Sequence, residues 1–200
     1  ASFGSSGAAW YPGEEHISRS RLAAAMKRWG FSSLEEFHRA SVDRPDWFWA
    51  AAAEDLGIPL RGQVHTVRDE SLGRAFPQWF KGATLNAVES CVDRHAADPA
   101  QAQRAAVTYE GDSSQQRSLT FAELKVEVDR FAAGLRRLGV VKGDRVALFM
   151  PPVPEAAVTL MACAKIGAVG VPAFSGYGSE SLATRLNAAE AKVLVTVDST

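Results

Sequence analysis

Three apolar segments alternate with two helical segments in the last third of this sequence. The apolar segments are residues 145–150, 169–174 and 192–197, and the helical ones are residues 155–166 and 179–191. A strand that is apolar at nearly every position is typical of a sheet covered on both faces. A strand–helix–strand connection in such a sheet makes the strands parallel and the crossover right-handed. We therefore predict an α/β fold, the first half of a doubly wound, mostly parallel sheet.

The longest helix is predicted immediately before this sheet. Thr120 is followed three residues later by Glu123, the spacing of a capping box that satisfies free amides at a helix start. Apolar residues then recur at steps of three and four: Phe121, Leu124, Val128, Phe131, Leu135 and Leu138. This stripe must lie against a sheet or another helix.

The first 80 residues are rich in aromatic side chains and favour helices. Periodicity and helix-start residues predict helices over residues 16–29, from Ser32 or Ser33 to residue 40, and over residues 45–57. Residues 58–82 are polar and rich in glycine and proline, so we expect at most short strands there. A further helix is expected over residues 85–95 and a short strand over 105–109.

Composition excludes several classes of function. The formal net charge is −1 with both signs interspersed, which argues against a nucleic acid or an anionic membrane surface as partner. Cys91 and Cys163 are too few for a disulfide framework and lack zinc-site spacing, so a cytoplasmic setting is expected. The four histidines are scattered, and no metal site is predicted. We expect neither a bilayer-spanning segment nor a signal peptide in this sequence.

The loop after residue 174 is the strongest candidate site that the residues themselves indicate, because ligands bind beyond the carboxyl ends of parallel strands. Gly176 and Gly178 open the next helix and Asp198 follows 22 residues after Gly176, which is nearly a dinucleotide-binding layout. Ser181 stands where that layout has its third glycine. The alternative is a tight strand-to-helix turn, whose free amides could still hold a phosphate. No catalytic constellation is evident.

Several segments resemble one enzyme family. Residues 119–124 (Leu-Thr-Phe-Ala-Glu-Leu), 142–147 (Lys-Gly-Asp-Arg-Val-Ala) and 163–169 (Cys-Ala-Lys-Ile-Gly-Ala-Val) resemble motifs of AMP-forming acyl-activating enzymes. Residues 91–95 (Cys-Val-Asp-Arg-His) and 41–57 are similar to the acetyl-CoA and acetoacetyl-CoA synthetase branch. The resemblance implies a helical N-terminal extension over residues 16–82 and the first part of an AMP-binding (adenylation) domain, incomplete here, over 83–200. The Gly-Ser-Ser-Gly opening at residues 4–7 predicts a flexible tail over residues 1–15.

This resemblance implies an acid–CoA ligase that uses ATP, CoA and Mg²⁺. Such an enzyme converts a carboxylic acid to an acyl adenylate and then to a CoA thioester. Family members are several times longer, and their phosphate loop, magnesium-binding acid and adenylation lysine have no match in these 200 residues. We therefore expect no catalytic or metal-binding residue here, no tightly bound cofactor, and no activity from this piece alone. The acid stays open among acetate, propionate, acetoacetate and larger acids.

The resemblance also implies one binding site within the sequence. In acetyl-CoA synthetases a Phe-Gly-Gly loop lies near the CoA nucleotide, and the matching residues are Phe174, Ser175 and Gly176. Ser175 departs from the first glycine of that loop. The alternative function is a non-catalytic module that binds a nucleotide or dinucleotide, or that contacts a protein through an unpaired sheet edge. Such an edge would also allow a homodimer.

Overall fold

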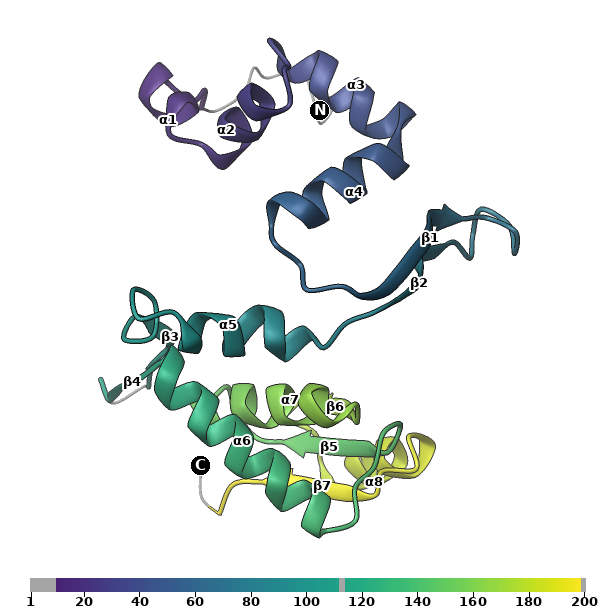
Figure 1. Ribbon diagram of the computed structural model, residues 1–200. Coiled ribbons are helices and arrows are strands. Elements are labelled where there is room, and N and C mark those ends of the chain that lie inside the picture. Colours follow the sequence, from purple (N-terminus) through teal and green to yellow (C-terminus); the bar gives the residue numbers. More distant parts are fainter. Residues whose placement is uncertain (1–9, 112–113, 199–200) are drawn as a thin grey trace, which may run out of the picture. The chain divides into compact units, whose positions relative to one another are not determined.

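The computed structural model describes residues 10–111 and 114–198, which form two compact units (Figure 1). Unit 1 comprises residues up to 58 together with 63–83, and unit 2 comprises residues 59–62 together with those from 84 onward. Unit 1 contains α1 (Glu14–Ser18), α2 (Arg21–Arg28), α3 (Leu34–Asp43), α4 (Pro45–Asp55) and most of β1 (Arg61–Asp69) and β2 (Gln78–Thr84). Unit 2 contains a π-helical turn η1 (Glu89–Asp93), α5 (Arg94–Ala97), β3 (Ala105–Glu110), β4 (Gln116–Thr120), α6 (Phe121–Arg137), β5 (Arg145–Phe149), α7 (Pro154–Ile166), β6 (Val169–Ala173), α8 (Ser179–Ala188) and β7 (Val193–Thr196).

Unit 1 is organised around a cluster of aromatic rings. Neighbouring ring centroids in this cluster lie 5.3–6.1 Å apart, and its members are Trp29, Phe31, Phe37, Trp47 and Phe48. Helix α3 begins where capping predicts, since the Ser33 hydroxyl accepts a hydrogen bond from the Glu36 amide (3.1 Å). Helix α4 begins at Pro45, as predicted from a proline at the first helical position. The single helix predicted over residues 16–29 is wrong. Ser20 is extended and caps α2 through the Ala23 amide, which divides the segment into two helices.

The segment from residue 58 to residue 82 contains more strand than expected. β1 spans nine residues and β2 seven, and the two strands pair in a two-stranded sheet. Gly82 makes the close approach possible, because it has a φ of +92° and a side chain there would collide with the Gln63 carbonyl oxygen. Trp79 contacts Trp49, with ring centroids 6.0 Å apart, and so fixes β2 on the helices.

The predicted parallel sheet is confirmed in unit 2. Its order is β6-β5-β7, and β5 is parallel to both neighbours, with Val146 opposite Gly170 and Val193. The central side chains of β5, Val146, Ala147 and Leu148, are buried, as its apolar sequence predicts. Helix α7 packs against both β5 and β6, and α6 lies beside α7 (Figure 1). The carboxyl ends of the three strands therefore meet at one edge of the sheet.

Helix α6 follows its predicted stripe except at its end. Thr120 and Glu123 form the predicted capping box, and Leu124, Val128 and Leu135 are buried in the core. Leu138 is 66% exposed, because the helix ends at Arg137 and Leu138 points away from the core. Strand β4 precedes this helix and pairs with β3 in an antiparallel ladder. This strand was not predicted, because its sequence is mostly polar.

The helix predicted over residues 85–95 is irregular in the structure. Residues Glu89–Asp93 form the π-helical turn η1, and only the short α5 continues from it. Val88 and Val92 are both buried in the core of unit 2. A π-helical turn inserts an extra residue into a helix and often lies at a specialised position. Here it brings Asp93 to α7.

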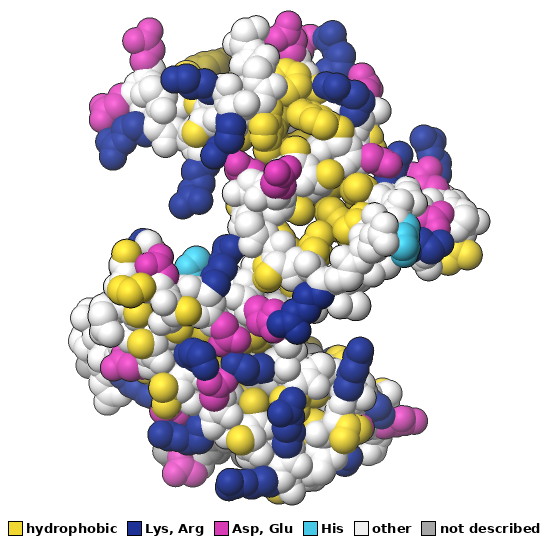
Figure 2. Space-filling model, in the orientation of Figure 1, with side chains coloured by type: hydrophobic (Ala, Val, Ile, Leu, Met, Phe, Trp, Pro, Cys, Tyr) yellow, Lys and Arg dark blue, Asp and Glu magenta, His cyan; other side chains and the backbone are white. Residues whose placement is uncertain are grey.

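The surface carries mixed charge. Figure 2 shows Lys and Arg side chains interspersed with Asp and Glu side chains over the face in view. Among the described helices, none combines the length and the apolar composition that a bilayer crossing needs.

Candidate functional site

The loop after β6 places three predicted residues at the carboxyl edge of the sheet. Phe174 directly follows β6 and is 68% exposed, and Ser175 and Gly176 are also exposed. The Tyr177 amide donates a hydrogen bond to the Phe174 carbonyl (3.1 Å), so the chain turns tightly toward α8. Gly178 is the N-cap of α8 and supplies no side-chain cap. Amides of the first turn of α8 therefore remain available to a ligand.

Two aromatic rings of this loop contact each other, and an arginine of α8 lies over one of them. The rings of Phe174 and Tyr177 meet edge to face, with centroids 5.5 Å apart at 83°. The guanidinium carbon of Arg185 lies 3.9 Å from the centre of the Tyr177 ring. Gly176 leaves room for this arrangement, because a side chain there would lie 2.6 Å from the Phe174 ring. Sequence analysis identified the loop but not Tyr177 or Arg185.

The structure places the dinucleotide-like residues without joining them into a site. Ser181 lies exposed in the first turn of α8, and Asp198 lies exposed two residues beyond β7. Among the described residues, no hydrogen bond or ion pair connects Asp198 to the Phe174 loop. The tight strand-to-helix turn is therefore the geometry observed, and its free amides are the feature that could hold a phosphate.

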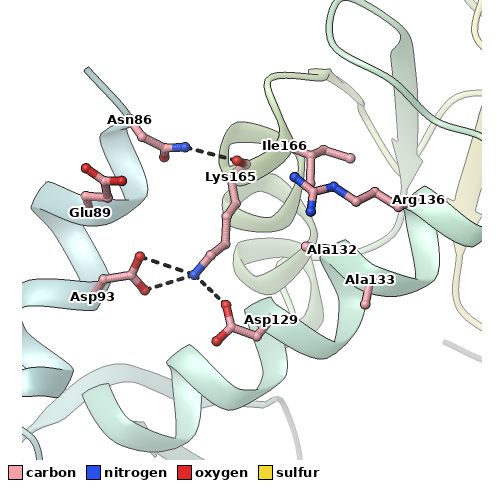
Figure 3. A pocket seen from close by; sticks show the side chains of 9 residues that line it. All are labelled: Asn86, Glu89, Asp93, Asp129, Ala132, Ala133, Arg136, Lys165 and Ile166. Atoms are coloured by element: carbon pink, nitrogen blue, oxygen red, sulfur yellow. Dashed lines mark hydrogen bonds and ion pairs between the residues drawn. The ribbon is translucent and has the colours of Figure 1, made fainter. Parts of the chain in front are cut away.

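A second polar cluster surrounds Lys165 at the end of α7 (Figure 3). Lys165 Nζ donates to both Asp93 oxygens, at 3.0 and 3.2 Å, and also to Asp129 of α6. Asp129 receives a second lysine, Lys125. The side-chain amide of Asn86 donates a hydrogen bond to the backbone carbonyl of Lys165 (2.9 Å). A cavity of about 440 Å³ lies beside this cluster and is lined by Asn86, Glu89, Asp93, Asp129, Ala132, Ala133, Arg136, Lys165 and Ile166.

The charges in this cluster are already satisfied by one another. Desolvation opposes ionisation at Asp129, but hydrogen bonds from Lys125 and Lys165 outweigh it and lower the pKa of that carboxyl. Desolvation likewise opposes the charged form of Lys165, and its two carboxylate partners nevertheless raise the pKa of the lysine. A protonated lysine held by two carboxylates is a poor base and a poor nucleophile. We interpret the cluster as a clamp that joins η1, α6 and α7.

Sequence analysis missed this clamp for a simple reason. Asp93 and Lys165 are 72 residues apart and lie on different helices. No local spacing identifies such a pair.

The remaining titratable candidates do not converge. Within residues 10–111 and 114–198, no three His, Cys, Asp or Glu side chains are arranged to hold a metal ion. His95 stacks on Phe121, with ring centroids 4.8 Å apart. Cys163 is buried, and desolvation raises the pKa of its thiol, which makes it unreactive.

The structure has a parallel sheet with a glycine-containing loop at its carboxyl edge. Comparison with known families shows the enzyme class to which the chain belongs. The family model for AMP-binding enzymes matches residues 93–200, more than half of the chain. The chain belongs to this family. The model of the acetyl-coenzyme A synthetase N-terminus matches residues 34–91.

Individual proteins of this family are similar to the chain in sequence and in structure. An acetyl-coenzyme A synthetase of Streptomyces coelicolor is 42% identical over 166 residues, which cover 83% of this chain and 25% of the relative. An acetyl-coenzyme A synthetase of Alcanivorax borkumensis is 40% identical over 167 residues, which cover 83% of this chain and 25% of the relative. The solved acetoacetyl-CoA synthetase from Streptomyces lividans superposes with a TM-score of 0.85 at 33% identity, covering 94% of this chain and 30% of its own.

These findings confirm the resemblance to acyl-activating enzymes and the α/β fold class. The chain spans about a quarter of the length of the curated relatives that it matches.

Proposed function

We propose that this chain is the N-terminal part of an ATP-dependent, AMP-forming acid–CoA ligase. The observation that carries the proposal is the order of the two family matches, an acetyl-coenzyme A synthetase N-terminus followed directly by an AMP-binding segment. Relatives named acetyl-coenzyme A synthetase, which are 42% and 40% identical over 83% of the chain, support the same conclusion.

The proposed reaction has two steps. A carboxylate oxygen attacks the α-phosphorus of ATP, and pyrophosphate leaves. The thiol of CoA then attacks the acyl carbon of the adenylate, loses its proton and displaces AMP. Both steps develop negative charge on oxygen, which cationic groups must stabilise. We assign Mg²⁺, which would neutralise phosphate charge, and the adenylation residues to parts of the protein outside these 200 residues.

The contribution of the described residues is to bind CoA at the Phe174 loop. The exposed Phe174 ring offers a flat apolar surface to the adenine base. Amides in the first turn of α8 can donate to a phosphate, with the helix dipole favouring negative charge. Gly176 lets the Phe174 ring lie against bare backbone, because a side chain there would lie 2.6 Å from the ring. Ser175 replaces a glycine of the family loop at an exposed position, where its side chain meets solvent.

The proposal extends to the organisation of the protein. We assign residues 16–82 to the helical extension and 83–200 to the start of the adenylation domain. Residues 1–9 of the tail predicted over residues 1–15 lie outside the described part of the chain, and helix α1 begins at Glu14, within the predicted tail. The proposal also includes a cytoplasmic location, a homodimer and no nucleic acid partner.

The decisive experiment compares the 200-residue chain with the complete protein of which it is a part. The complete protein should exchange pyrophosphate into ATP when a carboxylic acid is present, and a panel of acetate, propionate, acetoacetate and longer acids should identify the substrate. The 200-residue chain should show no exchange. Exchange by the 200-residue chain, or none by the complete protein with any acid, would contradict the proposal.

Calorimetry on the complete protein distinguishes CoA from a dinucleotide at the Phe174 loop. The proposal predicts heat of binding with CoA that Phe174→Ala reduces. Binding of NAD that the same substitution abolishes, without any CoA binding, would support the dinucleotide module instead.

A further inference from the structure

Arg185 and Phe174 are connected through the ring of Tyr177. We propose that Arg185 is a positioning residue for CoA, which holds Tyr177 and thereby sets the orientation of the Phe174 ring that receives the adenine base. This inference rests on the proposed binding of CoA at the Phe174 loop. It assigns a role to a residue of α8 that has no place in the two reaction steps.

The first link is the contact between Arg185 and Tyr177. The Arg185 guanidinium lies 3.9 Å from the centre of the Tyr177 ring. Its Nη1 donates to the Ser181 carbonyl at 3.0 Å, which anchors the side chain to its own helix. Among the described residues, Arg185 forms no ion pair with a carboxylate. Its planar cation is therefore directed to the ring, and stacking of this kind suits arginine better than lysine.

The second link is the contact between Tyr177 and Phe174. Their rings meet edge to face at 83°, with centroids 5.5 Å apart. Gly176 presents bare backbone to the Phe174 ring, since a side chain there would lie 2.6 Å from it. Phe174 is thus held by Tyr177 and by Gly176, and most of its surface remains in solvent.

This arrangement predicts an effect on CoA binding and none on adenylation. A ring that is already oriented loses less conformational freedom when a ligand binds. Without Arg185, Tyr177 loses its stacking partner and Phe174 samples more orientations. We expect the KM for CoA to rise about two- to fivefold, the factor that corresponds to a cation–π energy of about 0.5–1 kcal/mol at 25 °C.

The test uses the complete protein and measures the two half-reactions separately. Arg185→Met removes the cation, Arg185→Lys keeps the charge but not the planar stack, and Tyr177→Leu removes the ring. Tyr177→Phe is the conservative variant, because it keeps the ring. Arg137→Met is the matched control, an exposed arginine near the end of another helix of unit 2. Thermal unfolding verifies that each variant folds.

Arg185→Met and Tyr177→Leu should each raise the KM for CoA, with unchanged kcat and unchanged acid-dependent pyrophosphate exchange. The double variant should be no worse than either single variant, because both act through the same stack. Tyr177→Phe and Arg137→Met should match the wild type, and Arg185→Lys should lie between.

The inference is overturned if Arg185→Met leaves the KM for CoA unchanged, or if the two single effects are additive. It is also overturned if pyrophosphate exchange falls in parallel with CoA use, because the role would then be a general structural one. Failure of the proposed function has a different outcome, since the wild-type complete protein would then produce no thioester at all.

Discussion

Truncation of Leu135 tests whether α6 is the helix that closes the core of unit 2. Leu135 is 2% exposed and belongs to the main hydrophobic cluster, so Leu135→Ala removes three buried carbon groups. Transfer alone costs about 0.8 kcal/mol per group, or ~2.4 kcal/mol. The cavity that remains adds to this, so we expect a loss of about 2–5 kcal/mol in the free energy of unfolding. Leu138→Ala is the matched control, since that side chain is 66% exposed and should cost less than about 0.5 kcal/mol.

The assay must report on unit 2 by itself. All five tryptophans, at positions 10, 29, 47, 49 and 79, belong to unit 1, so their fluorescence follows that unit. Hydrogen exchange at the backbone amides of β5 follows the opening of the parallel sheet. A loss of 2 kcal/mol or more accelerates this exchange about 30-fold or more. Equal exchange in the Leu135→Ala and Leu138→Ala chains would refute the placement of the stripe against the core.

Three further predictions concern polar contacts in unit 2. Lys165→Met leaves Asp93 without its cation and should lower the free energy of unfolding by about 1–2 kcal/mol, because the pair is only partly exposed. The double variant with Asp93→Asn should recover part of this loss. If denaturant titrations show that the two substitutions have fully additive effects, the residues do not form a clamp. The Arg117 guanidinium lowers the pKa of Glu155 from its ordinary value of 4.5, so this pair stabilises the fold above pH 4.5 and loses its effect as the pH falls through the lowered native pKa. Glu155→Gln should therefore flatten the acid limb of a stability-versus-pH curve, and an unchanged limb would show that the pair contributes nothing. Thr120→Ala removes the hydroxyl of the capping box and should cost about 0.5–2 kcal/mol by chemical denaturation, whereas Thr120→Ser should cost little.

The sequence pattern predicted a segment correctly where residues close to it in the chain determine its structure. The strands predicted over residues 145–150 and 169–174 appear as β5 and β6 within one residue, because their apolar runs and bounding glycines and prolines are local features. The capping box at Thr120 is equally local. Periodicity failed at Ser20, where a side chain that caps a helix overrides an apolar stripe that runs through it.

Long-range contacts explain the rest of what the sequence did not predict. Strand β1 is polar except at Val64 and Val67, and it pairs with β2. The clamp at Lys165 joins three helices, and none of its partners is near it in sequence. At the candidate site, the Phe174 loop was identified both by its place after a predicted parallel strand and by resemblance to a family motif. The stack of Arg185 on Tyr177 depends on the turn between β6 and α8, which only the structure shows.

Product analysis of the complete protein tests the central claim most directly. The protein is incubated with ATP, Mg²⁺, CoA and the acid that supports pyrophosphate exchange, and nucleotides and thioesters are quantified by chromatography. An AMP-forming acid–CoA ligase yields AMP and acyl-CoA in equal amounts, with pyrophosphate as the third product. Formation of ADP and phosphate with the thioester, or consumption of ATP without any thioester, would contradict the claim.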